Sequence, residues 1–284
     1  GLYVSELTLG TMTFDTEGGS YAGLIGATGQ DLATRMVDLS IEAGINIFDT
    51  ANVYSSGVSE EMLGVALGSR RQDNLIATKL YNTMTTGPND LGTSRLAIMR
   101  EVEGSLKRLG TDYIDLYQVH NFDITTPLEE TLRALDDLVR QGKVRYIGLS
   151  NFAGWQIAKT DGMARLLGTE RFCSAQSYFS LVGRELEREI LPAAMDLGLG
   201  TFIWSPLASG FLSGKYTRDS EASGRRANFD YPPIDKDQGF DIVDVLTDIA
   251  ETKAASVAQI ALAWLLHKPG VTSVIVGARK EAQL

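Results

Sequence analysis

Four side chains that could together move a proton stand at, or a few residues after, the ends of short apolar runs in this sequence. They are Asp49, Tyr54, Lys79 and His120. An ammonium beside a phenol favours the ionised phenol and lowers its pKa from the reference value of about 10. A carboxylate can keep the ammonium charged and oriented, and an imidazole can hydrogen-bond a reacting oxygen. Gathered in one place, these groups would donate a proton to a developing alkoxide, which predicts an enzyme.

The apolar runs alternate with helical patterns along almost the whole chain. Strands are predicted at residues 7–10, 45–49, 75–79, 113–119, 144–149, 172–176, 201–204 and 273–276. Helices are predicted at residues 31–43, 59–67, 94–109, 128–141, 155–167, 185–197, 238–253 and 257–267. Strands joined through helices form parallel sheets with right-handed crossovers, and eight such units favour a closed barrel. We therefore predict an α/β protein, a (β/α)8 TIM barrel forming a single domain over residues 1–284, with the four residues converging at the C-terminal ends of its strands.

Local patterns add detail to this prediction. The helix at 128–141 has a strong start signal, with Thr126 as N-cap, Pro127 at the first helical position and Glu129 completing a capping box. The glycine-rich stretch 18–29 is expected to be a surface loop. Residues 205–231 are expected to be irregular, because they lack both helical and strand periodicity.

Composition narrows the class of protein further. The chain has 284 residues, 44% of them hydrophobic, and a net charge of −10, which argues against nucleic-acid binding. No stretch reaches the roughly 18 consecutive apolar residues of a membrane helix, and no signal peptide is recognised. The single cysteine, Cys173, is expected to be a small buried core residue, which suits a reducing cytoplasm. Because the chain begins at Gly1, we expect a domain trimmed at both termini.

Neither of two common phosphate-binding motifs is present in the sequence. No Gly-x-Gly-x-x-Gly follows a predicted strand, so the dinucleotide fingerprint of the Rossmann fold is absent. The segment from Gly210 to Lys215 is similar to a P-loop, but its first glycine is one place late and Tyr216 replaces the Ser or Thr that the motif requires. No set of metal ligands is predicted.

The segments that carry the four residues resemble the aldo-keto reductase superfamily. They read GINIFDTANVY at 44–54, IATK at 76–79 and DYIDLYQVH at 112–120. The resemblance continues in order through GKVRYIGLSN at 142–151, WSPL at 204–207, SGK at 213–215 and VGAR at 276–279. The sequences of these motifs are most similar to those of the branch that contains bacterial members and potassium-channel β-subunits. Nearly the whole chain is covered.

The resemblance gives the four residues separate roles. Tyr54 would be the general acid in reduction and the base in oxidation, with Lys79 tuning it, Asp49 holding Lys79 and His120 orienting the substrate carbonyl. No side chain can supply a hydride, so a cofactor must provide it. Besides Tyr54 and His120, the substrate-binding residues are expected to include apolar pocket walls, although ordinary loop packing explains these residues equally well: Phe14, Tyr81 and Phe122.

The resemblance also implies a nicotinamide cofactor, preferably NADP(H) over NAD(H). Thr11 and Met12 would contact the cofactor together with Asp49 and line the pocket floor. The nicotinamide would be held by Ser150, Asn151 and Gln176 and would stack on Trp204. The loop that wraps the pyrophosphate would contribute Ser205, Leu207, Gly210, Ser213 and Lys215. The adenosine end would be bound by Gly277, Arg279 and Gln283, and Arg279 would read the 2′-phosphate with help from Lys280, Arg225 or Arg226, for which solvated surface positions are an equal alternative.

These observations lead to one main interpretation and two others. The main one is an NADPH-dependent reductase acting on a small-molecule aldehyde or ketone, with neither a nucleic acid nor a membrane as partner. The others are an NAD-linked sugar or alcohol dehydrogenase, because the same four residues serve both reaction directions, and a nicotinamide-binding regulatory subunit that senses redox state.

Overall fold

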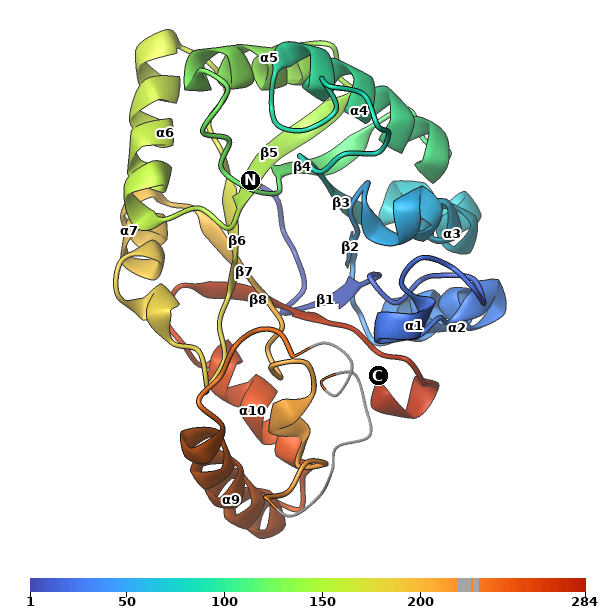
Figure 1. Cartoon of the computed structure of the whole chain (residues 1–284), viewed down its shortest axis with the longest axis vertical. Coiled ribbons are helices and arrows are strands. Elements are labelled where there is room, and N and C mark those ends of the chain that lie inside the picture. The colour runs from blue at the N-terminus through green and yellow to red at the C-terminus, as the bar shows by residue number, and fades with distance from the viewer. Residues whose placement is uncertain (219–225, 227–229) are drawn as a thin grey trace.

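Eight parallel strands close into a barrel in the order of the sequence (Figure 1). The computed structural model describes residues 1–218, 226 and 230–284. The strands are β1 Leu7–Gly10, β2 Ile47–Asp49, β3 Leu75–Leu80, β4 Ile114–Val119, β5 Val144–Ser150, β6 Ser174–Tyr178, β7 Gly200–Trp204 and β8 Val271–Val276. The barrel closes where Leu7 of β1 pairs with Val274 of β8. The predicted (β/α)8 barrel is therefore confirmed.

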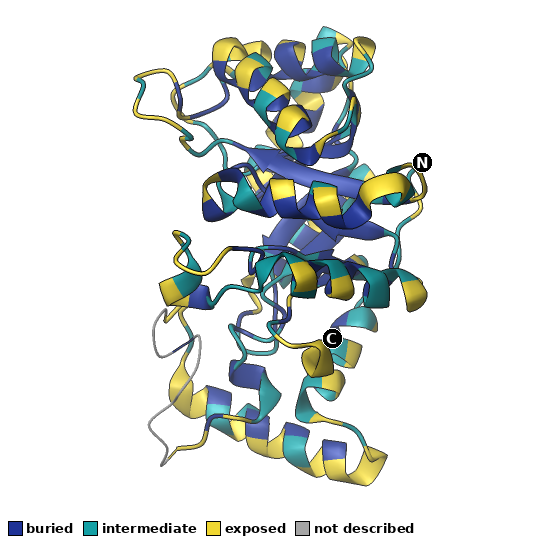
Figure 2. Cartoon of the chain, turned by 90° about the vertical axis from the view of Figure 1, so that its right-hand side faces the viewer, coloured by how far each residue is buried: buried dark blue, intermediate teal, exposed yellow. Residues whose placement is uncertain are grey.

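Helices surround this barrel, and each has buried residues on one side and exposed residues on the other (Figure 2). The α-helices are α1 Ala22–Ile25, α2 Gly29–Glu42, α3 Val58–Leu67, α4 Arg95–Leu109, α5 Leu128–Arg140, α6 Gly154–Leu167, α7 Ile190–Leu197, α9 Lys236–Lys253 and α10 Val257–Leu266. Short 3₁₀ turns are η1 Tyr54–Gly57, η2 Gly68–Asp73, η3 Glu185–Glu187, η4 Phe211–Ser213 and η5 Glu281–Gln283.

The inside of the barrel is built in layers, because side chains of a strand alternate between its two faces. One layer is apolar, and its members form a single cluster: Ile47, Ala77, Leu116, Phe202 and Ile275. Two residues further along four of these strands, at the same inward parity, stand Asp49, Lys79, Gln118 and Trp204. The apolar layer therefore closes the barrel beneath a layer of chemically active groups.

The structure corrects several local predictions. The capping box at α5 is wrong: Pro127 is the N-cap, and the Thr126 hydroxyl donates instead to Asp123 Oδ2 at 2.7 Å. The predicted helix at 185–197 is split into η3 and α7. Proline inside a helix cannot donate to the preceding turn, so a new helix starting at Ile190 places Pro192 in the first turn, where no such bond is needed.

Two further predictions are only partly right. The glycine-rich stretch 18–29 is a loop that contains the short helix α1. Cys173 is half-buried rather than fully buried, and burial raises the pKa of its thiol to about 11, which makes it unreactive. Within the described residues, no single helix is long and apolar enough to cross a membrane. In that described part of the chain, α9 and α10 taken together, across a bend of 96°, meet the length and composition criteria.

Candidate active site

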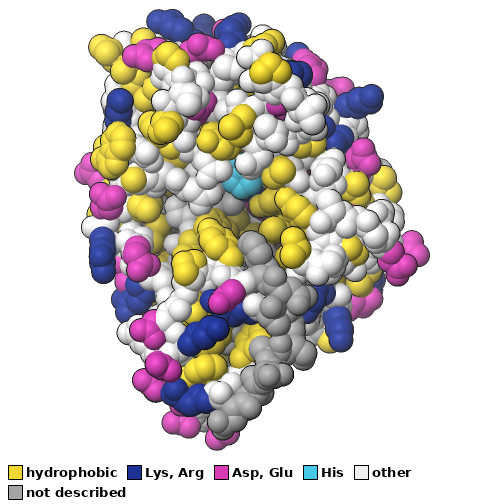
Figure 3. Space-filling view, in the orientation of Figure 1, with side chains coloured by type: hydrophobic (Ala, Val, Ile, Leu, Met, Phe, Trp, Pro, Cys, Tyr) yellow, Lys and Arg dark blue, Asp and Glu magenta, His cyan; other side chains and the backbone are white. Residues whose placement is uncertain are grey.

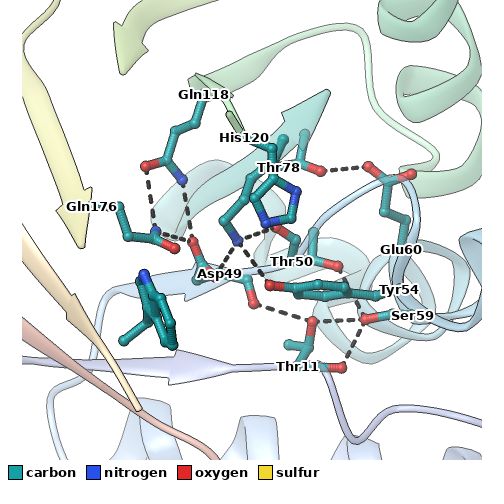
Figure 4. A network of polar contacts seen from close by, with 12 residues as sticks. Thr11, Asp49, Thr50, Tyr54, Ser59, Glu60, Thr78, Gln118, His120 and Gln176 are labelled. Atoms are coloured by element: carbon teal, nitrogen blue, oxygen red, sulfur yellow. Dashed lines mark hydrogen bonds and ion pairs between the residues drawn. The ribbon is translucent and has the colours of Figure 1, made fainter. Parts of the chain in front are cut away.

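The barrel brings the four predicted chemical residues together at the C-terminal ends of its strands (Figure 4). Lys79 Nζ lies 2.5 Å from Asp49 Oδ1 and 3.4 Å from the hydroxyl of Tyr54. The rings of Tyr54 and His120 meet edge to face with centroids 6.0 Å apart. Asp49 ends β2, Lys79 lies near the end of β3, and His120 directly follows β4. Strand register alone therefore positions three of the four groups.

Lys79 is a fully buried ammonium that is held by oxygen atoms. Its side chain has no exposed surface, and Nζ donates to Asp49 Oδ1 and, at 2.8 Å, to the carbonyl oxygen of Thr50. Burial lowers the pKa of Lys79, but the charge of Asp49 and the oxygen of Tyr54 outweigh burial, so the pKa is raised overall. The amine therefore stays protonated near neutral pH while facing the phenol.

The second carboxylate oxygen of Asp49 is held by the side-chain amides of two glutamines. Gln176 Nε2 donates to Asp49 Oδ2 at 2.7 Å, and Gln118 Nε2 donates to the same oxygen at 3.2 Å. Both glutamines are buried, and Gln176 also donates to Gln118 Oε1. Gln118 was not among the predicted site residues. Its signal was present in the sequence, since a polar residue two places before His120 shares the inward parity of that strand end.

His120 is an imidazole that stays neutral near pH 7. Burial, reinforced by the nearby charge of Lys79, lowers its pKa from 6.5 to about 3. The backbone of His120 is fixed on both sides, because its N–H donates to Leu80 O at 2.9 Å and its carbonyl accepts from Asn151 Nδ2 at 2.9 Å. The neutral ring can therefore donate a hydrogen bond from one nitrogen and accept one at the other without bringing a charge to the site.

Tyr54 begins a turn whose next two residues have a backbone conformation that is rare for residues other than glycine. The two residues after it, Ser55 and Ser56, have φ values of 50° and 54°, in the left-handed region. The hydroxyl of Ser59 braces this turn by bonding to the hydroxyls of Thr11 and Thr50, at 2.8 Å and 3.0 Å (Figure 4). A strained turn must be held by its surroundings, so the position of Tyr54 depends on these contacts.

A buried carboxylate on the outer side of the barrel joins this turn to the strand that carries Lys79. Glu60 is fully buried in the first turn of α3 and accepts the hydroxyl of Thr78 on Oε1 at 2.6 Å. Its Oε2 accepts from Arg108 Nε of α4 at 2.6 Å. The Arg108 stem packs on Gly57, where an added Cβ would come within 2.6 Å of its Cδ. Glu60 was not predicted, because only the folded arrangement brings its two partners, Thr78 and Arg108, against it.

Replacing Glu60 with glutamine is expected to destabilise the protein by roughly 3–5 kcal/mol, because Arg108 would keep a partly buried charge without its partner. Loosening the turn should also lower kcat for any reaction that uses Tyr54. Urea unfolding measures the first effect and steady-state kinetics the second. Glu61→Gln is the matched control, since Glu61 is exposed on the same turn and should change stability by less than about 0.5 kcal/mol. Equal effects of the two substitutions would contradict this account.

The residues predicted to bind a nicotinamide surround the same opening. Asn151 has φ 58°, and its Oδ1 accepts from Trp204 Nε1 at 3.0 Å. The Trp204 ring packs between Tyr178, with centroids 5.1 Å apart, and Tyr231, which stacks on it at 5.9 Å. Ser150 is buried, and its hydroxyl has no hydrogen-bond partner within the described part of the chain.

The loop predicted to wrap a pyrophosphate contains five residues with positive φ, which turn its peptide groups. These are Ser205, Ala208, Ser209, Gly210 and Gly214. Turns of this kind aim backbone N–H groups into a concavity that suits an anion. Lys215 is exposed nearby, and a Cβ added at Gly210 would lie 2.9 Å from its Nζ. Ser213 donates its hydroxyl to Gly210 O at 2.7 Å, and Leu207 packs against the apolar cluster below.

Two residues of the predicted adenosine end, Arg279 and Gln283, lie together after β8. Arg279 lies against Gly26, where an added Cβ would come within 3.0 Å of its Cδ, and its backbone N–H donates to Gln283 Oε1 at 3.0 Å. Gln283 lies in the three-residue turn η5. Gly277 and Lys280 are exposed.

Arg226 is not the solvated surface residue that the sequence allowed. It is 7% exposed and donates to Ala208 O and Pro232 O at 3.2 Å and 2.9 Å, and it pairs with Asp230. It therefore braces the loop that was predicted to wrap a pyrophosphate. Arg225 lies outside the described residues.

Of the residues expected to form pocket walls, Phe14 was predicted wrongly, and the ring of Phe122 packs against other aromatic rings. Phe14 is fully buried in the main core, so it offers no surface to a substrate. The Phe122 ring meets Phe152 and Trp155 edge to face, at 5.1 Å and 5.9 Å. Tyr81 is half-buried at the end of β3, with φ 142°. Figure 3 shows a hollow on this face, bordered by apolar side chains and with a histidine at its edge.

Comparison with known proteins identifies the family. The sequence model of the Aldo/keto reductase family matches residues 6–284. The chain belongs to the aldo/keto reductase family. The resemblance seen in its motifs is thereby confirmed, and so is its general class as an oxidoreductase.

The relatives of this aldo/keto reductase differ in their described activities. It is 39% identical over 295 residues to "Uncharacterized oxidoreductase YrpG" of Bacillus subtilis (strain 168), covering 100% of the chain and 86% of the relative. It is 40% identical over 261 residues to "Probable voltage-gated potassium channel subunit beta" of Oryza sativa subsp. japonica, covering 89% and 79%. It is 33% identical over 300 residues to "Versiconal hemiacetal acetate reductase" of Aspergillus parasiticus, covering 97% and 85%.

Aldo/keto reductases generally use a nicotinamide cofactor, and the residues of this member suit one. The unpartnered hydroxyl of buried Ser150 lies at the end of β5, and β5 pairs with the strand that carries Gln176. A carboxamide has both a donor and an acceptor, so it can satisfy such a hydroxyl and an amide side chain together. The turned loop after β7 and the exposed Lys215 supply groups of the kind that neutralise phosphate.

Proposed function

We propose that this aldo/keto reductase reduces an aldehyde or ketone with a hydride from NADPH, and that Tyr54 is the general acid. The observation that carries the proposal is the fully buried Lys79 ammonium, paired with Asp49 and 3.4 Å from the Tyr54 hydroxyl. Such a pairing favours the phenolate that remains after the proton has been given away. The alkoxide that forms from a carbonyl is strongly basic, so a phenol made more acidic in this way suits its protonation.

The remaining residues have supporting roles in this proposal. When bound, the cofactor supplies the hydride to the carbonyl carbon. Ser150, Asn151 and Gln176 hold its amide and Trp204 borders its ring, while Ser205, Gly210, Ser213 and Lys215 bind the pyrophosphate. Thr11 and Met12 line the floor together with Asp49, and Leu207 packs beneath the loop. Neutral His120 donates a hydrogen bond to the substrate oxygen and orients it for Tyr54. In alcohol oxidation the same groups act in reverse.

The experiment that tests the function is consumption of NADPH against a panel of aromatic and aliphatic aldehydes, ketones and sugars. We expect at least one neutral carbonyl to give steady turnover at a rate typical of enzymes, about 1 s⁻¹ or more. Turnover confined to NAD⁺ with alcohols or sugars would instead establish the dehydrogenase interpretation.

A second function is favoured by one observation, the 40% identity to a protein described as a probable channel β-subunit. A redox-sensing subunit would bind NADPH tightly and turn over slowly. Single-turnover kinetics separate the two functions: a fast hydride step followed by release far slower than chemistry would favour the sensor.

The preference for NADPH is expected to depend on Arg279. Its guanidinium can form a charge-assisted bond to the 2′-phosphate, and such bonds contribute about 1.5–3 kcal/mol, or roughly ten- to a hundredfold in affinity. Arg279→Ala should therefore weaken NADPH binding by that factor and change NADH binding by less than about twofold, as measured by fluorescence titration. Arg140→Ala, on the exposed face of α5, is the control. Equal losses for both cofactors would remove Arg279 from the phosphate site.

A further inference from the structure

A half-buried asparagine contacts the ring of His120 at its Nδ1 atom. Asn82 follows β3, and its Nδ2 lies 3.3 Å from His120 Nδ1. With the side-chain amide in this orientation, Nδ2 donates the hydrogen bond and Nδ1 accepts it. A neutral imidazole with an acceptor at Nδ1 carries its hydrogen on Nε2.

We propose that Asn82 is a positioning residue that fixes His120 in the Nε2–H tautomer, so that the imidazole presents a hydrogen-bond donor to the substrate oxygen. This inference rests on the proposed function, in which a carbonyl oxygen faces His120. A carbonyl or alkoxide oxygen only accepts hydrogen bonds, so the opposite tautomer would point a lone pair at the substrate.

The surroundings of His120 keep its ring neutral, so the tautomer decides which nitrogen can donate a hydrogen bond. The charged and titratable groups facing it are Lys79 from β3, with Asp49 behind the ammonium, and Tyr54 from η1. An imidazolium would donate from both nitrogens and need no partner to orient it. Burial and the Lys79 charge keep the pKa of His120 at about 3, so the ring is neutral throughout the working pH range and only one nitrogen carries hydrogen.

The second histidine provides an internal reference with the opposite tautomer. His267 ends α10, and its Nδ1 lies 2.8 Å from the carbonyl oxygen of Ala263. A carbonyl oxygen only accepts, so His267 must carry its hydrogen on Nδ1 when neutral. The chain contains two histidines. A protein labelled with ¹⁵N-histidine should therefore show one ring of each tautomer.

Long-range ¹H–¹⁵N NMR of the whole chain tests the proposal without any turnover. The pattern of couplings should identify His120 as Nε2–H from pH 6 to 9, and His267→Gln assigns the signals by removing the other set. Finding Nδ1–H at His120, or an equal mixture of tautomers, would overturn the proposal. Because this result does not depend on catalysis, it stands even if the panel assay shows no carbonyl reduction.

A substitution that reverses the donor adds a second test. Asn82→Asp keeps the shape but offers an acceptor, so His120 should shift to Nδ1–H or to the imidazolium, and kcat for a good carbonyl substrate should fall about a hundredfold, as on loss of one oxyanion donor. Asn89→Asp adds the same charge at an exposed position of the same loop and should change neither result. If the aspartate variant fails to fold, Asn82→Ser removes the amide and should leave a mixture of tautomers. Retention of pure Nε2–H in either Asn82 variant would contradict the proposal.

Discussion

Replacing Tyr54 with phenylalanine is expected to lower kcat for carbonyl reduction by roughly a hundred- to ten-thousandfold, the usual contribution of a positioned general acid. The substitution removes one oxygen, the one that lies 3.4 Å from Lys79 Nζ. NADPH binding should be nearly unchanged, because no residue of the proposed cofactor site is altered. Stopped-flow measurement of hydride transfer, alongside fluorescence titration of NADPH, separates the two quantities.

A neighbouring phenol makes the matched control. Tyr21 is half-buried and lies near Tyr54. Burial, Tyr54 and Asp15 all raise the pKa of Tyr21, which makes Tyr21 a poorer acid. Tyr21→Phe should change kcat by less than about threefold. If Tyr21→Phe abolished reduction and Tyr54→Phe did not, the acid would have been assigned to the wrong tyrosine.

Replacing Lys79 with methionine is the second substitution with a large expected effect. It would leave the Asp49 carboxylate buried without its cation, which should destabilise the protein by roughly 3–5 kcal/mol, measured by urea unfolding at pH 7. Carbonyl reduction should also fall by a factor similar to that of Tyr54→Phe, because the ammonium no longer stabilises the phenolate.

The double variant Lys79→Met/Asp49→Asn separates these two effects. Removing the second charge should restore most of the stability, since a neutral amide can bond to Gln118 and Gln176, but it should restore no activity. Recovery of activity in the double variant would show that Lys79 acts only through folding.

The pH dependence of the Lys79 contribution follows from the direction of its pKa shift. The pKa is raised above the ordinary value of 10.5, so the stabilisation is fully present below that value and is lost as the pH rises through the higher folded value. Comparison of variants at pH 7 therefore measures the full effect. An unfolding experiment at pH 9 should give the same difference between wild type and Lys79→Met.

Much of this site could be predicted because strand alternation is visible in sequence. Ile47 and Asp49, or Leu116 and Gln118, share an inward face, so a polar residue two places after an apolar one marks the strand end at the opening. The barrel could be predicted because the eight alternating strand and helix patterns are also visible in the sequence. Lys79 and His120 needed only this register to be placed.

The features that were missed depend on contacts between segments that are distant in the chain. Nothing local distinguishes Glu60 from exposed Glu61, and its role appears only when Thr78 and Arg108 are folded against it. Phe14 looks like a loop aromatic until the helices cover it. Arg226 looks like a surface charge until Ala208 and Pro232 turn their carbonyl oxygens to it. The sequence around Thr126 matched a helix-capping pattern, but the Thr126 hydroxyl donates its hydrogen bond to Asp123 instead.

The apolar layer under the site has a consequence for the order of events. Because Ile47, Leu116 and Phe202 seal the barrel below, everything that enters must use the same mouth. Ser150 and Gln176 are buried, whereas Tyr54 and His120 keep part of their surface exposed. With the proposed assignments, the nicotinamide therefore sits behind the carbonyl. On these assignments, we expect the dinucleotide to bind before the substrate and to leave after the alcohol product.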